Sequence, residues 1–193
     1  AGVYLQITRG THQRIHRFPE NIKPTVYACA FPFSSKPDQL ENGVNVITAD
    51  DIRWLRCDIK SIALLPNVLY AQKAEENGSA EVIFIRNGVV TEASHSNVMG
   101  VKDGIVYTHP DSNLILPGIT KKVILEICQT NGIKVTEEGI GALELASIDE
   151  LMIVGTGSEV TPVVNIDGIK VNDGKPGPVT RFIQDKFFEQ TQA

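Results

Sequence analysis

Two turn dipeptides, Asn87-Gly88 and Asp103-Gly104, constrain the fold of this chain more than any other feature. Both favour the type I′ turn, whose twist matches that of the strands in a two-residue β-hairpin. Each lies between two short runs rich in branched apolar residues, namely 82–86 and 89–92 around the first, and 97–102 and 105–108 around the second. The middle of the chain is therefore predicted to be antiparallel β-structure.

Helical patterns lie on both sides of these hairpins. Apolar residues recur at helical spacing over 119–131, and Gly132 follows as a C-cap residue. A second helix is predicted over 67–76, with Pro66 in its first turn, and a third over 179–188. Further elements are expected in this order: strands over 44–48, 54–60 and 134–136, a short helix over 143–146, strands over 151–155 and 160–166, and a turn at Asp167-Gly168. This order indicates an α+β domain rather than a wound parallel sheet.

The first part of the chain has a different pattern. Two strands are predicted over 3–8 and 25–31, joined by a polar connection. Residues 31–43 then have the composition of a linker, with prolines, serines and a glycine. We therefore expect a boundary that separates residues 1–36 from a larger domain over 37–193. Because the first strand starts with no turn or cap before it, the chain is also expected to be cut from something longer.

Composition narrows the class of ligand. The net charge is −5, and no run of basic residues is longer than Lys121-Lys122, which argues against nucleic acid as the main partner. Three cysteines without metal-ligand spacing suit reduced thiols in a cytoplasmic protein and predict no metal site. No apolar run approaches the length of about 20 residues that spans a bilayer. A small molecule is therefore the expected ligand, with no membrane partner.

Lys60 is the first candidate for chemistry. It lies in the run RWLRCDIKSIALLPNVL, which otherwise suits burial, and a buried amine pays a desolvation cost for its charge. Two interpretations remain open at this point. The ammonium reaches solvent on its flexible stem, or the amine is kept neutral to act as a nucleophile.

Three further segments add complementary groups. Glu92 opens a stretch of small and hydroxyl residues, TEASHSN. Gly118 directly precedes the predicted helix, so the N–H groups of Ile119 and Thr120 can face an anion. Thr156 lies in GTGSEVTP, where small residues allow a phosphate to approach the backbone. An amine, a carboxylate and a phosphate site together indicate pyridoxal 5′-phosphate.

These motifs, together with the opening YLQITRGTHQRIHRFP, resemble the D-amino-acid aminotransferases among the fold type IV pyridoxal-phosphate enzymes. The resemblance implies that Lys60 carries the cofactor as a Schiff base and that Glu92 faces the pyridine nitrogen. It implies that the phosphate-binding residues are Ile119, Thr120 and Thr156. It also implies that Arg14 and His16 receive the substrate α-carboxylate from the partner subunit of a homodimer.

The same resemblance implies a fold and an activity. The fold is an antiparallel-rich pseudo-barrel with helices, forming the large cofactor-binding domain over 37–193, after the C-terminal part of a small α/β domain and a linker over 1–36. The activity is transamination between D-amino acids, such as D-alanine and D-glutamate, and 2-oxo acids, with ping-pong kinetics. Alternatives are a branched-chain aminotransferase, an aminodeoxychorismate lyase, an amine transaminase, or a fragment that binds cofactor without turnover.

The sequence departs from the family pattern in two ways that bear on the site. His95 stands in the serine-rich run after the glutamate, where a hydroxyl is usual, and Gly155 stands where a serine often precedes the phosphate-binding threonine. A phosphate-contacting arginine and an active-site tyrosine, which the family supplies from further N-terminal segments, have no counterparts here.

Overall fold

The computed structural model describes residues 1–191, which form two compact units, 1–36 and 37–191. The first unit is a hairpin of β1 (Gly2–Thr8) and β2 (Thr25–Phe31), paired antiparallel from Gly2 opposite Phe31 to Thr8 opposite Thr25. Both predicted strands are confirmed. Exposed apolar side chains lie along both strands, including Val3, Leu5, Ile7, Val26 and Tyr27.

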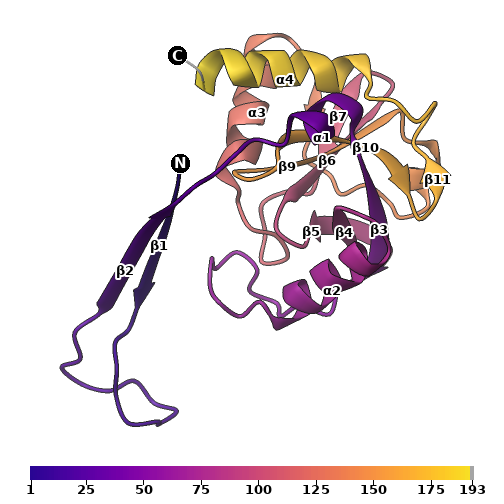
Figure 1. The fold of residues 1–193 in the computed structure, drawn as a ribbon. Coiled ribbons are helices and arrows are strands. Elements are labelled where there is room, and N and C mark those ends of the chain that lie inside the picture. Colours follow the sequence, from indigo (N-terminus) through magenta and orange to yellow (C-terminus); the bar gives the residue numbers. More distant parts are fainter. Residues whose placement is uncertain (192–193) are drawn as a thin grey trace. The chain divides into compact units, whose positions relative to one another are not determined.

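The second unit contains one curved, mixed sheet (Figure 1). Its strands are β3 (Val44–Asp50), β4 (Glu81–Arg86), β5 (Val89–Ala93), β6 (Asn97–Lys102), β7 (Ile105–Thr108), β8 (Val135–Thr136), β9 (Glu150–Gly155), β10 (Glu159–Ile166) and β11 (Ile169–Lys170). The order is β5-β4-β3-β10-β9-β6-β7-β8, with β11 beside β10. Most pairs are antiparallel, but β3 runs parallel to β4 and β10, and β7 runs parallel to β8.

Both predicted hairpins form, and the β4–β5 and β6–β7 pairs are antiparallel. Asn87, Gly88, Asp103 and Gly104 all have positive φ, as a type I′ turn requires. The sheet curls because β5 and β6 are far apart in its order but are joined by only three residues. The Ala93 N–H donates to the Ser96 carbonyl across this connection at 2.8 Å. Glu92 therefore lies where the curled sheet turns back on itself.

The helices of this unit are α1 (Pro37–Asn42), α2 (Leu65–Glu76), α3 (Ile119–Thr130) and α4 (Pro178–Thr191). The last three match predicted helices, and α2 begins two residues early because Pro66 fits its first turn. Two predictions are wrong. Part of the expected linker forms α1, and the short helix predicted over 143–146 is a 3₁₀ turn, Glu144–Ser147.

Apolar side chains fill both faces of the central strands. One cluster includes Val98, Leu151, Ile153, Val163 and Ile166, and the other includes Met99, Met152, Val154, Ile124 and Ile183. The four central residues of β9, 151–154, alternate between the two clusters, so this part of the strand is apolar on both faces. The second cluster lies against α3 and α4, which pack side by side (Figure 1).

The prediction of β-structure over 54–60 is wrong. The segment forms turns, in which the Ile59 N–H donates to the Arg56 carbonyl at 3.1 Å. The Cys57 thiol and the Trp54 carbonyl oxygen lie 3.2 Å apart. Arg56 also forms a local ion pair with Asp58, and these short-range contacts replace the ladder that a strand requires.

None of the helices within residues 1–191 combines the length and the apolar character needed to cross a membrane.

Glu150 anchors the start of α4, and this predicts a measurable loss of stability. Its buried carboxylate accepts hydrogen bonds from the N–H groups of Val179 at 3.0 Å and Thr180 at 2.7 Å. A Cβ at Gly177 would lie 2.1 Å from the Glu150 Cδ, so the approach needs glycine. Glu150→Gln should lower the free energy of unfolding in urea by about 1–2 kcal/mol, because it removes the charge at the helix N-terminus and one acceptor. The matched change Glu126→Gln, on the exposed side of α3, should cost under about 0.5 kcal/mol; equal losses would contradict this role.

Candidate active site

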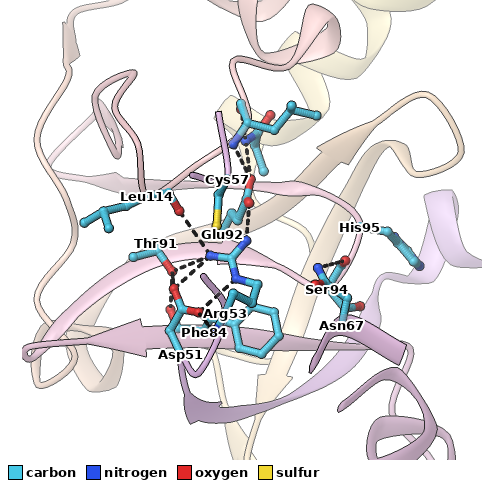
Figure 2. A network of polar contacts seen from close by, with 12 residues as sticks. Asp51, Arg53, Cys57, Asn67, Phe84, Thr91, Glu92, Ser94, His95 and Leu114 are labelled. Atoms are coloured by element: carbon cyan, nitrogen blue, oxygen red, sulfur yellow. Dashed lines mark hydrogen bonds and ion pairs between the residues drawn. The ribbon is translucent and has the colours of Figure 1, made fainter. Parts of the chain in front are cut away.

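Glu92 is the centre of a buried polar cluster (Figure 2). Its Oε1 pairs with Nη1 of Arg53, and its Oε2 accepts hydrogen bonds from the Leu116 N–H at 3.0 Å and from Nδ2 of Asn97 at 3.2 Å. All three partners are donors. A carboxylate only accepts hydrogen bonds, so three donors around it favour the ionised form of Glu92.

Arg53 holds this carboxylate in place from the segment that follows β3. Its guanidinium binds Asp51 as a fork, Nε to Oδ1 at 2.9 Å and Nη2 to Oδ2 at 2.8 Å. Nη2 also donates to the Leu114 carbonyl at 3.1 Å, and the group lies over the ring of Phe84 (Figure 2). A lysine could not reproduce these planar contacts.

Burial and charge pairing act in opposite directions on the two carboxyl groups. Burial alone would raise the pKa of Asp51, but hydrogen bonds from Arg53 and Arg86 outweigh it and lower the pKa to about 2. For Glu92, burial has the larger effect and raises the pKa above its ordinary value, while Arg53 and the Leu116 N–H oppose the rise. Asp51 is thus the firmly ionised partner that fixes Arg53.

Asn97 connects Glu92 to the first turn of α3. Its Nδ2 donates to the Leu116 carbonyl at 2.9 Å as well as to Glu92. A Cβ at Gly118, the N-cap residue of α3, would lie only 2.1 Å from Oδ1 of Asn97, so only glycine permits this contact. At the start of this helix, Ile119 is 75% exposed and Thr120 is buried.

The turn between β9 and β10 lies next to the same region. Asn97 is paired with Val154 in the sheet, one residue before Gly155. The hydroxyl oxygens of Ser96 and Ser158 are 2.7 Å apart, and Thr156 between the two strands is exposed. Glu92, the start of α3 and this turn are therefore linked through neighbouring hydrogen bonds. A Cβ at Gly155 would lie 3.5 Å from the Ser96 hydroxyl, so packing does not force glycine there.

Lys60 is exposed, which agrees with the interpretation that its amine reaches solvent, but the run around it is not buried as its composition suggested. Trp54, Ile62 and Leu65 of the same run are 45%, 72% and 70% exposed. The segment around Lys60 is nevertheless connected by hydrogen bonds to residues next to the Glu92 cluster, both before and after Lys60. Before Lys60, the Cys57 N–H donates to the Asn113 carbonyl at 2.9 Å. After it, Nδ2 of Asn67 donates to the Ser94 carbonyl at 2.7 Å.

Arg14 and His16 lie in the connection between β1 and β2 of the first unit, and both side chains are exposed. Their assignment to the substrate carboxylate stays a prediction.

The sequence reasoning missed Asp51, Arg53 and Asn97. Two charged residues at alternate positions directly after an apolar strand were the available signal for the first two. Buried charges occur almost only as partners, so these residues called for a carboxylate or a base elsewhere in the chain. Nothing local pointed to Asn97, because its partners lie on β5 and before α3.

These residues fit pyridoxal phosphate. A carboxylate offers about four lone-pair sites, and the three donors around Glu92 leave one for a ring N–H. The first turn of α3 carries no acidic residue, so its N–H groups favour an anion. Gly157 would meet nothing within 4 Å if it carried a Cβ, and the buried hydroxyl of Ser94 has no hydrogen-bond partner among residues 1–191. The turn thus has room for a phosphate, and a donor is available nearby.

The curled sheet and its helices have the fold of the fold type IV aminotransferases. A solved branched-chain amino acid aminotransferase from Escherichia coli superposes with a TM-score of 0.87 at 31% identity, covering 97% of this chain and 64% of that one. The enzyme from Thermoproteus uzoniensis, solved with norvaline, gives a TM-score of 0.85 at 28% identity over 96% of this chain and 63% of that one. The expected α+β pseudo-barrel is confirmed.

The family model described as "Amino-transferase class IV" matches residues 1–166, and the chain belongs to this family. Among its relatives, the D-alanine aminotransferase of Bacillus licheniformis is 46% identical over 95% of this chain, and that of Staphylococcus haemolyticus is 49% identical over 96%. The chain spans 65% and 66% of the lengths of these two proteins.

The low pKa of Asp51 predicts how stability depends on pH. Its pKa falls from an ordinary 3.8 to about 2 on folding, so its contribution is present above the ordinary value and is lost as pH falls toward 2. Asp51→Asn should lower the free energy of unfolding by about 3 kcal/mol at pH 7, because it leaves Arg53 without its forked partner. This difference from wild type should shrink as pH is lowered through the range from 3.8 to about 2. Denaturation curves at several pH values measure it, and a difference that stays constant down to pH 2 would contradict the assignment.

Proposed function

We propose that this chain is the cofactor-binding part of a pyridoxal-phosphate-dependent aminotransferase that exchanges amino groups between D-amino acids and 2-oxo acids. The observation that carries the proposal is the buried carboxylate of Glu92, held by Arg53 and linked through Asn97 to the start of α3. The D-alanine aminotransferases, at 45–49% identity, support D-alanine as a substrate, and D-glutamate is the second substrate that the family resemblance implies.

Each group has a role in this proposal. The cofactor, when bound, supplies an electron sink for the charge that develops when a substrate loses its α-proton. Lys60 attaches the cofactor and then carries the α-proton as base and acid. Its exposure suits this role, since the amine must meet an incoming substrate. Glu92 keeps the ring nitrogen protonated by its negative charge.

The N–H groups of Ile119 and Thr120 and the turn that contains Thr156 would hold the phosphate. The anion is stabilised there by the partial positive charge of the helix N-terminus. Of the two departures, Gly155 removes one possible hydroxyl contact but leaves the backbone approach open.

The substrate side belongs to a homodimer, in which Arg14 and His16 of one chain bind the substrate carboxylate in the site of the other. The guanidinium of Arg14 offers two parallel donors to a carboxylate. A second copy also explains the apolar side chains that the larger unit exposes around Lys60, since soluble proteins seldom leave such a patch uncovered. They are Ile52, Trp54, Leu55, Ile59, Ile62, Leu64, Leu65, Val68 and Leu69.

In the same proposal, residues 37–193 are the large cofactor-binding domain and residues 1–36 are the end of a small domain with its linker. The site of action is the cytoplasm. Branched-chain transamination is the second candidate, because the E. coli branched-chain enzyme has the same fold at 31% identity. A lyase, an amine transaminase and a non-catalytic cofactor-binding fragment are the remaining alternatives.

The experiment compares wild type with Lys60→Ala and the matched control Lys122→Ala, an exposed lysine on α3. Each protein is incubated with pyridoxal phosphate, followed by absorption spectroscopy, borohydride reduction and peptide mass analysis. Wild type and Lys122→Ala should show a visible band and a cofactor-derived mass on the peptide with Lys60. Lys60→Ala should show neither, because it lacks the attaching amine.

Adding different amino acids to the wild-type protein distinguishes the candidate functions. The band of wild type should change with D-alanine but not with L-leucine, and amino groups should then pass to 2-oxoglutarate. Loss of the band with L-leucine alone would favour branched-chain transamination, while a stable band with every amino acid would favour a non-catalytic fragment. Cofactor attachment elsewhere than Lys60 would contradict the proposal.

A further inference from the structure

Glu81, the first residue of β4, is a buried carboxylate outside the cluster around Glu92. Only 1% of its surface is exposed. Its Oε1 accepts hydrogen bonds from the Ser96 hydroxyl and from the His95 backbone N–H, each at 3.1 Å, and also pairs with Nδ1 of the His95 ring. Its Oε2 is buried without a hydrogen-bond partner among residues 1–191. Burying a carboxylate costs free energy that only its hydrogen-bond donors offset. Within the described residues, the donors at Oε1 therefore provide all of the stabilisation of this charge.

The imidazole of His95 is a donor that a serine at this position would not replace. A contact between Nδ1 and a carboxylate oxygen requires a proton on Nδ1. His95 lies in the three-residue connection between β5 and β6, and its ring extends to Glu81 on the neighbouring strand β4. The same Nδ1 is 3.2 Å from the Ser96 hydroxyl. Glu81 and His95 thus surround Ser96 on two sides.

Ser96 connects Glu81 by hydrogen bonds to the turn between β9 and β10. Its hydroxyl proton points to Glu81, because a carboxylate only accepts. The oxygen of Ser96 is then free to accept the hydroxyl proton of Ser158, 2.7 Å away. The Ser158 carbonyl accepts in turn from the Thr161 hydroxyl at 2.6 Å. The directions of the two serine hydrogen bonds are therefore set by the buried charge of Glu81, while the Thr161 bond can run only toward the carbonyl.

We propose that Glu81 and His95 are positioning residues that act through Ser96 and Ser158 to hold the β9–β10 turn in its phosphate-binding shape. The inference rests on the proposed function, which places the cofactor phosphate against Thr156 in this turn. In this role neither residue needs to contact the cofactor. His95 is a departure from the family pattern, in which a hydroxyl is usual in this run.

The test measures affinity for two ligands that differ only in the phosphate. Apoprotein is titrated with pyridoxal phosphate and with pyridoxal, and binding is followed by quenching of Trp54, the only tryptophan in the sequence. His95→Ala should weaken pyridoxal phosphate binding about tenfold, near the lower end of the effect of losing a hydrogen bond to a charged group. Pyridoxal affinity should stay within about twofold, because the ring and Lys60 are untouched.

His95→Asn is the conservative variant. Its side-chain N–H₂ can occupy the position of the imidazole Nδ1, so it should restore most of the phosphate-dependent affinity. The control His109→Ala, a histidine whose ring contacts the carbonyl of the adjacent Pro110, should leave both affinities unchanged. Equal losses for both ligands in His95→Ala would indicate general structural damage and overturn the proposal, as would no loss at all.

A double-mutant experiment tests whether His95 acts through Glu81. In a Glu81→Gln background, His95→Ala should cause no further loss, because its partner charge is already gone. Ser158→Ala leaves the buried charge in place and so tests the relay even where Glu81→Gln does not fold; it should reduce phosphate-dependent affinity by a similar factor. Full affinity in Ser158→Ala would overturn the proposal. Wild type that fails to bind pyridoxal phosphate through Lys60 would instead overturn the proposed function, so the two failures are distinguishable.

Discussion

The larger unit depends on the ion pairs that the buried guanidinium of Arg53 forms. This group lies between Asp51 and Glu92, so one cation serves two carboxylates inside the protein (Figure 2). Removing either type of partner from such a cluster leaves an uncompensated charge in a medium of low polarity. The segment after β3 must therefore remain where Arg53 can reach β5. A continuing strand would carry Arg53 away, which explains the turns that precede Lys60.

The same cluster determines how the other site segments are arranged. Glu92 lies at the point where the sheet curls, and Asn97 on the other side of that turn binds both Glu92 and the Leu116 carbonyl. This fixes the start of α3 beside the carboxylate. The hydroxyl contact between Ser96 and Ser158 then fixes the β9–β10 turn on the neighbouring strands. Glu92, the start of α3 and the β9–β10 turn are thus held together around the short connection between β5 and β6.

Local patterns predicted much of this fold and less of its site. The hairpins at Asn87-Gly88 and Asp103-Gly104, and the helix after Gly118, depend on turn preferences and periodicity within a few residues, and all three were predicted correctly. Glu92, the second carboxylate partner of Arg53, lies 39 residues away, and no local pattern encodes such a pairing. The run around Lys60 was wrongly expected to be a buried strand, because its composition cannot distinguish a core segment from an exposed apolar surface. The proposed role of Lys60 therefore rests on the resemblance of this run to known motifs.

The central claim is that Arg53 holds Glu92 as an anion which keeps the cofactor nitrogen protonated. The most direct measurement is the ¹⁵N NMR chemical shift of pyridoxal phosphate labelled at the ring nitrogen and bound to wild type or to Glu92→Gln. A pyridinium signal in wild type that moves to the unprotonated position in Glu92→Gln is the predicted result. The same nitrogen shift in both proteins would contradict the claim, because the carboxylate would then have no effect on the ring.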